Sequence, residues 1–180
     1  EGSKNIIVNM NAGYVSKDSW LNSIEIGGGR IIGEACHLID LCTYLCSSKV
    51  KSVCANYLGD SPQEDAENAS ILLRYENGSN AVINYFANGN KRYSKERIEA
   101  YFQGKTIIID NWRILKAYGV PGFSKMRTKL DKGHQREFCL LVHSIKTGQQ
   151  IIPIDEIINT TKASFAVIKN CSNIVIEIPI

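Results

Sequence analysis

The sequence predicts an α+β domain, in which an open, mainly antiparallel β-sheet carries helices packed on one face. Short segments with alternating or β-branched apolar residues fill much of the chain, and turn signals at Asn77-Gly78 and Gln103-Gly104 join four of them into two hairpins. Segments with helical periodicity occur once near the start and twice near the end. A chain of 180 residues is long enough to form one such domain around a buried core.

The expected elements follow in order along the chain. Strands are expected over residues 4–15, 50–58, 111–119 and 174–178, with hairpins over 68–87 and 96–110. Helices are expected over residues 31–45, 133–148 and 153–172, with Asp155 as a candidate N-cap. The polar or irregular segments 16–26, 59–67 and 121–133 are expected to be loops.

Composition and charge exclude several classes of partner. The net charge is only +3, and Lys and Arg are scattered, so no nucleic-acid partner is predicted. No segment reaches the roughly 18 apolar residues that a transmembrane helix needs, and no signal peptide opens the chain. We therefore expect no membrane partner and a cytoplasmic location.

Six cysteines are present, without a C-x-x-C pair or a convincing zinc spacing. Cys42 and Cys46 are four residues apart and would share a helical face, so a metal pair is conceivable. The alternative is that the cysteines are small, buried, apolar residues in a reducing compartment. We adopt this alternative and predict no metal site.

Three glycines in the segment 27–33 approach a nucleotide-binding pattern without matching it. Gly27, Gly29 and Gly33 form G-x-G-x-x-x-G, one residue off the dinucleotide fingerprint. That fingerprint requires a buried strand before the glycines, and SWLNSIEI is a poor one. The chain alone is therefore predicted to hold no cofactor.

A polar face on the first helix suggests acid/base chemistry. Glu34, His37, Asp40 and Tyr44 recur every three or four residues and so lie on one arc of a helix. Carboxylates one turn away on either side would orient an imidazole and support its protonated form. The alternative is a set of surface residues linked by weak ion pairs.

The segment GGGRIIGEACHLIDL, residues 27–41, resembles the start of the H-x-x-D helix in the C-terminal domain of Gfo/Idh/MocA oxidoreductases. His37 and Asp40 match the H-x-x-D pattern. The likeness extends to segments 11–20, 85–102, 133–138 and 158–168. The fold that it implies is an open antiparallel sheet with helices on one side, as in the C-terminal domain of glyceraldehyde-3-phosphate dehydrogenase.

The resemblance also implies an activity. In that family the histidine lies beside the substrate hydroxyl, so His37 is expected to act as an acid/base or orienting residue, with Asp40 and Glu34. The usual aspartate four residues before the histidine is Gly33 here, and the adjacent Glu34 is the candidate replacement. The family's lysine and most contacts to NAD or NADP belong to an N-terminal Rossmann domain. Residues 1–180 would then be the substrate-binding and oligomerisation domain, without that Rossmann domain.

Further candidates for substrate binding cluster at the ends of the expected strands. They are Asn11, Tyr14, Arg30, Tyr85, Asn88, Lys91 and Arg92. The basic members would suit a phosphate, a diphosphate or a uronate carboxylate, and each residue could equally be an ordinary surface or strand-end residue. His134 is expected to serve a helix terminus, and His143 to be a partly buried, hydrogen-bonded residue.

The sequence thus predicts part of an NAD(P)-dependent dehydrogenase that acts on a hydroxyl of a sugar, cyclitol or nucleotide sugar. The expected partners are a small sugar-like molecule and further copies of the chain, joined through the sheet face. The alternative is a non-enzymatic sugar-binding or dimerisation module that lacks the cofactor half.

Overall fold

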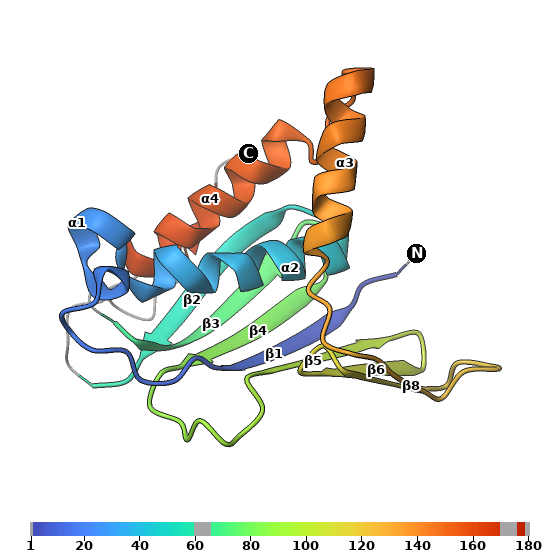
Figure 1. Cartoon of the computed structure of the whole chain (residues 1–180), viewed down its shortest axis with the longest axis horizontal. Coiled ribbons are helices and arrows are strands. Elements are labelled where there is room, and N and C mark those ends of the chain that lie inside the picture. Colours follow the sequence, from blue (N-terminus) through green and yellow to red (C-terminus); the bar gives the residue numbers. More distant parts are fainter. Residues whose placement is uncertain (1, 60–65, 170–175, 179–180) are drawn as a thin grey trace.

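The computed structural model of this chain describes residues 2–59, 66–169 and 176–178. Its strands form one sheet in the order β8-β7-β6-β5-β1-β4-β3-β2-β9 (Figure 1). They are β1 (Asn5–Asn11), β2 (Val50–Tyr57), β3 (Asn68–Tyr75), β4 (Asn80–Phe86), β5 (Glu96–Phe102), β6 (Lys105–Asp110), β7 (Ile114–Tyr118), β8 (Lys125–Arg127) and β9 (Ile176–Glu177). β1 and β4 are parallel, and the other neighbouring strands are antiparallel.

Local turn chemistry accounts for both predicted hairpins. Gly78 has a φ of 81°, and the Asn77 side chain accepts a hydrogen bond from the Ser79 amide at 3.0 Å. Gln103 and Gly104 both have positive φ, as a two-residue type I′ turn requires. The registers of β3 with β4 and of β5 with β6 follow from these turns.

The helices lie on one face of the sheet, as predicted (Figure 1). They are η1 (Trp20–Asn22), α1 (Ile24–Gly27), η2 (Ile31–Ala35), α2 (Cys36–Cys46), α3 (His134–Thr147) and α4 (Ile154–Lys169). Of these, α2 and α4 pack against the sheet. Side chains alternate along β1, β3 and β4, so Val8, Ile71 and Ile83 point into the core below α2 and α4. Ile39 of α2 and Val167 of α4 close this core from above.

α3 differs from the other long helices because it stands away from the sheet (Figure 1). None of its residues is buried. Phe138 and Ile145 are 67% and 74% exposed. His143 is also exposed, so the expectation of a partly buried histidine is wrong.

Several expected boundaries require correction. The loop 16–26 contains η1 and most of α1, and the loop 121–133 contains the short strand β8. The first helix begins with a π-helical turn, η2, in which the Cys36 amide donates to the Ile31 carbonyl. Asp155 is not an N-cap: it lies in the first turn of α4, where its carboxylate pairs with Lys49 at 2.7 Å. Residues 170–172 and 174–175, expected to be helix and strand, lie outside the described ranges.

The cysteines fall into different environments. Cys42 and Cys46 are buried in the core, where burial raises the pKa of both thiols, that of Cys46 to about 11. Cys139 is exposed, so the general expectation of buried cysteines is wrong there. Cys171 is not among the described residues. Within the described ranges, no group of three or more His, Cys, Asp and Glu side chains could hold a metal ion. None of the helices described is long and apolar enough to cross a membrane.

Candidate functional site

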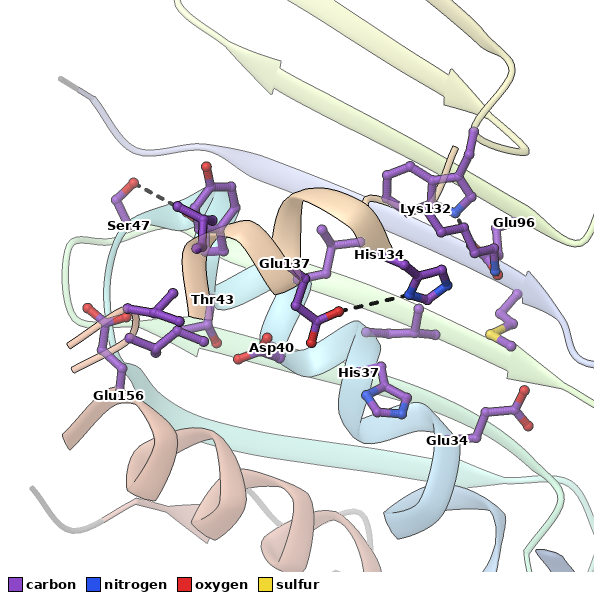
Figure 2. Close-up of a pocket in the computed structure, with 18 of the residues that line it drawn as sticks. Glu34, His37, Asp40, Thr43, Ser47, Glu96, Lys132, His134, Glu137 and Glu156 are labelled. Carbon is purple, nitrogen blue, oxygen red and sulfur yellow. Dashed lines mark hydrogen bonds and ion pairs between the residues drawn. The ribbon is translucent and has the colours of Figure 1, made fainter. Parts of the chain in front are cut away.

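A pocket of about 1020 Å³ lies between α2, α3 and the ends of β1 and β5. Its polar lining comes from Glu34, His37, Asp40, Thr43, Tyr44, Ser47, Ser48, Lys95, Glu96, Lys132, His134, Glu137 and Glu156. Its apolar lining comes from Met10, Leu38, Leu41, Trp112, Leu140, Ile151, Ile152 and Pro153. Figure 2 shows the α2 side of the pocket facing His134 and Glu137 of α3.

The three residues predicted for catalysis line this pocket together. His37 and Asp40 are exposed, whereas Leu38 and Ile39 between them are buried in the core. Glu34 precedes them on η2, and the three follow one another along the helix (Figure 2). Because the apolar side of α2 is held against the sheet, its polar side must face the pocket.

Glu34 is fixed by side chains from distant parts of the chain. Its Oε2 accepts hydrogen bonds from Tyr85 Oη at 2.6 Å and from Arg30 Nη2 at 3.1 Å. Arg30 is only 3% exposed, and its Nε donates to Tyr85 Oη at 2.7 Å. On the pocket side, Lys95 Nζ lies 3.6 Å from Glu34 Oε1. Arg30 and Tyr85 therefore act on Glu34 from behind the pocket wall.

This network changes the titration of its members. Burial opposes ionisation of Glu34, but the Tyr85 hydrogen bond and the charges of Arg30 and Lys95 outweigh it, so the pKa of Glu34 is lowered. Burial, together with the bond to the Glu34 carboxylate, raises the pKa of Tyr85. Glu34 is therefore a carboxylate at neutral pH, and Tyr85 is a neutral phenol.

Asp40 has the opposite environment. Partial desolvation by the surrounding side chains raises its pKa, and the charge of His37 offsets this only in part. Shifted carboxyl pKa values are common at functional sites, and Asp40 lies one helical turn from His37.

The raised pKa of Asp40 predicts a gain in stability when its charge is removed. Because the pKa is higher in the folded chain than in the unfolded chain, ionised Asp40 destabilises the fold at neutral pH. Asp40→Asn is therefore expected to increase the free energy of unfolding at pH 7 by about 0.3 kcal/mol, since solvent screens this partly exposed group. Urea unfolding measures the gain, which should vanish below the ordinary pKa of 3.8. Equal gains at pH 7 and pH 3 would contradict this explanation.

The glycines before α2 allow close backbone packing. A Cβ on Gly27 would lie 2.5 Å from the Trp20 carbonyl oxygen, and one on Gly33 would lie 2.9 Å from that of Gly27. Any side chain at position 33 would require the backbone to shift, which accounts for a glycine there. Because Gly27 and Gly33 pack closely against other backbone, these two glycines leave no room for a pyrophosphate.

The candidate substrate residues separate into two groups. Arg30 and Tyr85 hold Glu34, as described above. Asn11, Tyr14, Asn88, Lys91 and Arg92 lie at the end of β1 and in the loop after β4, and none is among the residues that line the pocket. Asn11 Nδ2 donates to the Asn90 carbonyl at 2.8 Å, whereas the other four are exposed.

A second charged cluster in the pocket was missed by sequence reasoning. Glu96 is buried, and its carboxylate accepts hydrogen bonds from Trp112 Nε1 and from Lys132 Nζ, the latter at 3.0 Å. Pairing of β5 with β6 sets Glu96 near Trp112, and Lys132 comes from the segment just before α3, so no local spacing could have revealed the cluster. His134, expected only at a helix terminus, begins α3 and also lines the pocket.

Comparison with known families decides what this arrangement belongs to. The family model described as the GFO/IDH/MocA C-terminal domain matches residues 5–108, more than half of the chain. The chain belongs to this family. The family and the α+β fold predicted from the sequence are therefore confirmed. No curated protein sequence matches the chain significantly.

Solved structures share the GFO/IDH/MocA C-terminal fold at low sequence identity. An oxidoreductase domain protein from Kribbella flavida has a TM-score of 0.79 at 18% identity, over 97% of this chain and 58% of its own. Aldose-aldose oxidoreductase from Caulobacter crescentus, complexed with glycerol, has a TM-score of 0.76 at 14% identity, over 97% and 55%. Levoglucosan dehydrogenase, in complex with NADH and levoglucosan, has a TM-score of 0.76 at 16% identity, over 99% and 59%. The chain therefore spans little more than half the length of these structures.

Proposed function

We propose that this chain is the substrate-binding domain of an NAD(P)-dependent oxidoreductase that acts on a hydroxyl carbon of a sugar, cyclitol or nucleotide sugar. Membership of the GFO/IDH/MocA family supports an oxidoreductase domain. The observation that carries the finer proposal is the pocket that Glu34, His37 and Asp40 line together. A bound nicotinamide would accept the hydride from the substrate carbon.

The residues of this chain would handle the proton of the same reaction. Oxidation of a hydroxyl releases a hydride from carbon and a proton from oxygen, and we assign the proton to the His37 imidazole. Asp40, one helical turn further on, would stabilise the imidazolium that forms. Arg30 and Tyr85 hold Glu34, and Lys95 pairs with it. The role of Glu34 would be to position Lys95 and to accept a hydrogen bond from a substrate hydroxyl.

The cofactor would be held by a second domain of the same enzyme. Gly27 and Gly33 pack against backbone, which argues against a site for the cofactor's phosphates at these two glycines. The matched structures extend well beyond this chain, and one of them holds NADH. We propose that an N-terminal Rossmann domain precedes this chain in the full-length enzyme and binds either NAD or NADP. We propose a cytoplasmic location for that enzyme.

The exposed face of α3 supports this domain arrangement. Phe138, Leu141, Val142 and Ile145 recur at helical spacing and form one apolar stripe, and all are exposed. His134 and Glu137 of the same helix line the pocket. A cofactor domain packed on the stripe would therefore also border the pocket.

The proposed packing predicts that one substitution has a small effect on stability in the isolated chain and a large one in the full-length enzyme. Phe138→Lys is expected to change the melting temperature of the isolated 180-residue chain little, because the side chain contacts solvent there. In the full-length enzyme it should cost about 3 kcal/mol, since a buried phenylalanine would be lost. Thermal unfolding of both proteins provides the comparison, with the exposed Tyr118→Lys as the control. Equal effects in both contexts would argue against a domain on this face.

The sheet face opposite the helices is proposed to join copies of the chain. Leu72 is exposed there, and a hydrogen-bonded row of Ser70, Asn84 and Asn9 crosses three strands. This mixed polar and apolar surface is compatible with a homo-oligomer.

The experiment that tests the function is a screen of the full-length enzyme with NAD and NADP against neutral sugars, cyclitols and nucleotide sugars. Formation of reduced nicotinamide that depends on His37 is expected with at least one of these compounds. If none is oxidised, the alternative takes the lead: a non-enzymatic sugar-binding module. Gly33 favours that alternative, since it replaces the family's usual aspartate.

A further inference from the structure

The charges that line the pocket indicate which substrates it accepts, an inference that rests on the function proposed above. Two lysines and five carboxylates line the pocket: Lys95, Lys132, Glu34, Asp40, Glu96, Glu137 and Glu156. Each lysine is already paired. Lys95 Nζ lies 3.6 Å from Glu34, and Lys132 Nζ lies 3.0 Å from the buried carboxylate of Glu96.

Three carboxylates remain, and the lining offers them no further lysine or arginine; Lys49, which acts on Glu156, lies outside the lining. Asp40 and Glu156 form no ion pair within the part of the chain that the structure describes. Among the described residues, the ion-pair partner of Glu137 is His134, whose Nδ1 lies 3.9 Å from Glu137 Oε2. The nearby histidine for Asp40 is His37. An anionic substrate group would therefore meet a surplus of negative charge.

The hydrogen-bonding capacity of the lining leads to the same conclusion. An ionised carboxylate only accepts hydrogen bonds, so it requires donors from a ligand. Ring hydroxyls and ammonium groups supply donors, whereas phosphates and carboxylates supply mainly further acceptors. Met10, Leu38 and Trp112 provide apolar surface for the ring itself.

The basic residues that could have bound an anion are engaged or lie elsewhere. Arg30 is buried behind Glu34, where it binds Tyr85 and the Gly13 carbonyl. Lys91 and Arg92 are exposed in the loop after β4 and do not line the pocket.

We propose that the pocket selects a polyhydroxylated ring without an anionic group, either neutral or amine-bearing, and discriminates against uronates and sugar phosphates. Glu137 and Glu156 determine this specificity from α3 and α4, opposite His37 on α2. Their carboxylates repel an anionic ring and accept hydrogen bonds from a neutral or cationic one.

Calorimetric titration of the full-length protein with three matched pyranoses tests the proposal: D-glucose, D-glucosamine and D-glucuronate. D-glucuronate is expected to bind at least about tenfold more weakly than D-glucose, and D-glucosamine no more weakly than D-glucose. The ratio of the Kd of D-glucuronate to that of D-glucose is the penalty on the anion. In the double variant Glu137→Gln/Glu156→Gln this penalty should fall by about threefold or more. Glu76→Gln, an exposed turn glutamate outside the pocket, is the matched control and should leave the penalty unchanged.

Equal or tighter binding of D-glucuronate would overturn the proposal, as would failure of all three rings to bind. Its failure differs from failure of the proposed function. His37-dependent oxidation of D-glucuronate would overturn the selectivity and leave the oxidoreductase function intact. If the rings bind with the predicted selectivity but no nicotinamide is reduced, the selectivity is supported and the protein is a sugar-binding module without enzymatic activity.

Discussion

Replacing His37 with alanine in the full-length enzyme is expected to lower kcat by about a hundredfold or more, the usual scale for a lost acid/base group. The imidazole reaches the pocket from the exposed side of α2, while Leu38 and Ile39 next to it are buried. The substitution should therefore remove the proton acceptor without disturbing the core. Steady-state rates of nicotinamide reduction measure the effect.

His143→Ala provides the matched control for this experiment. His143 is exposed on α3 and does not line the pocket, so its removal should leave kcat within about twofold of the parent. A loss of less than about threefold on removing His37 would exclude this residue from the mechanism.

Replacing Glu34 with alanine is expected to lower the stability of the 180-residue chain strongly. It would leave the buried guanidinium of Arg30 with only Tyr85 Oη at 2.7 Å and the Gly13 carbonyl at 3.5 Å. Removing the carboxylate that pairs with this buried guanidinium costs about 3 kcal/mol, because the charge of Arg30 stays desolvated without compensation. Chemical unfolding of this chain measures the difference.

Two further variants separate the charge effect from lost packing. The double variant Arg30→Met/Glu34→Leu should recover much of the loss, since no unpaired charge remains in the core. Glu25→Ala, an exposed glutamate of α1 outside any ion pair that the structure describes, should change stability by less than about 0.5 kcal/mol. A loss at Glu34 no larger than at Glu25 would contradict the proposed network.

The same network has a defined pH dependence. The pKa of Glu34 is lowered on folding, so its ionised form favours the folded chain. This contribution is complete above the ordinary pKa of 4.5 and is lost as the pH falls through the lower value of the folded state. Stability measured between pH 6 and pH 3 should therefore fall less steeply in Glu34→Gln than in the parent.

Much of the fold could be predicted because its signals are local. Asn77-Gly78 and Gln103-Gly104 predict hairpins from two residues each, since both turns require a positive φ. The polar arc of Glu34, His37 and Asp40 follows from helical periodicity and survives the π-helical turn at its start.

The rest depends on contacts between distant segments. Tyr85 and Glu34 are 51 residues apart, and they meet because β4 lies beneath the start of the helix. The parallel pairing of β1 with β4, which sets β1 between β4 and β5, has no local signature. The exposure of α3 also has no local signature, since its apolar residues recur at helical spacing but none is buried.

The intact mass of the native polypeptide in its source cell tests the central claim most directly. We predict a chain longer than this one by at least about 120 residues, enough for a cofactor-binding domain on the exposed face of α3. A native mass near 20.0 kDa would contradict the claim, because the polypeptide would then lack the cofactor half. The pocket around His37 would in that case belong to a sugar-binding module.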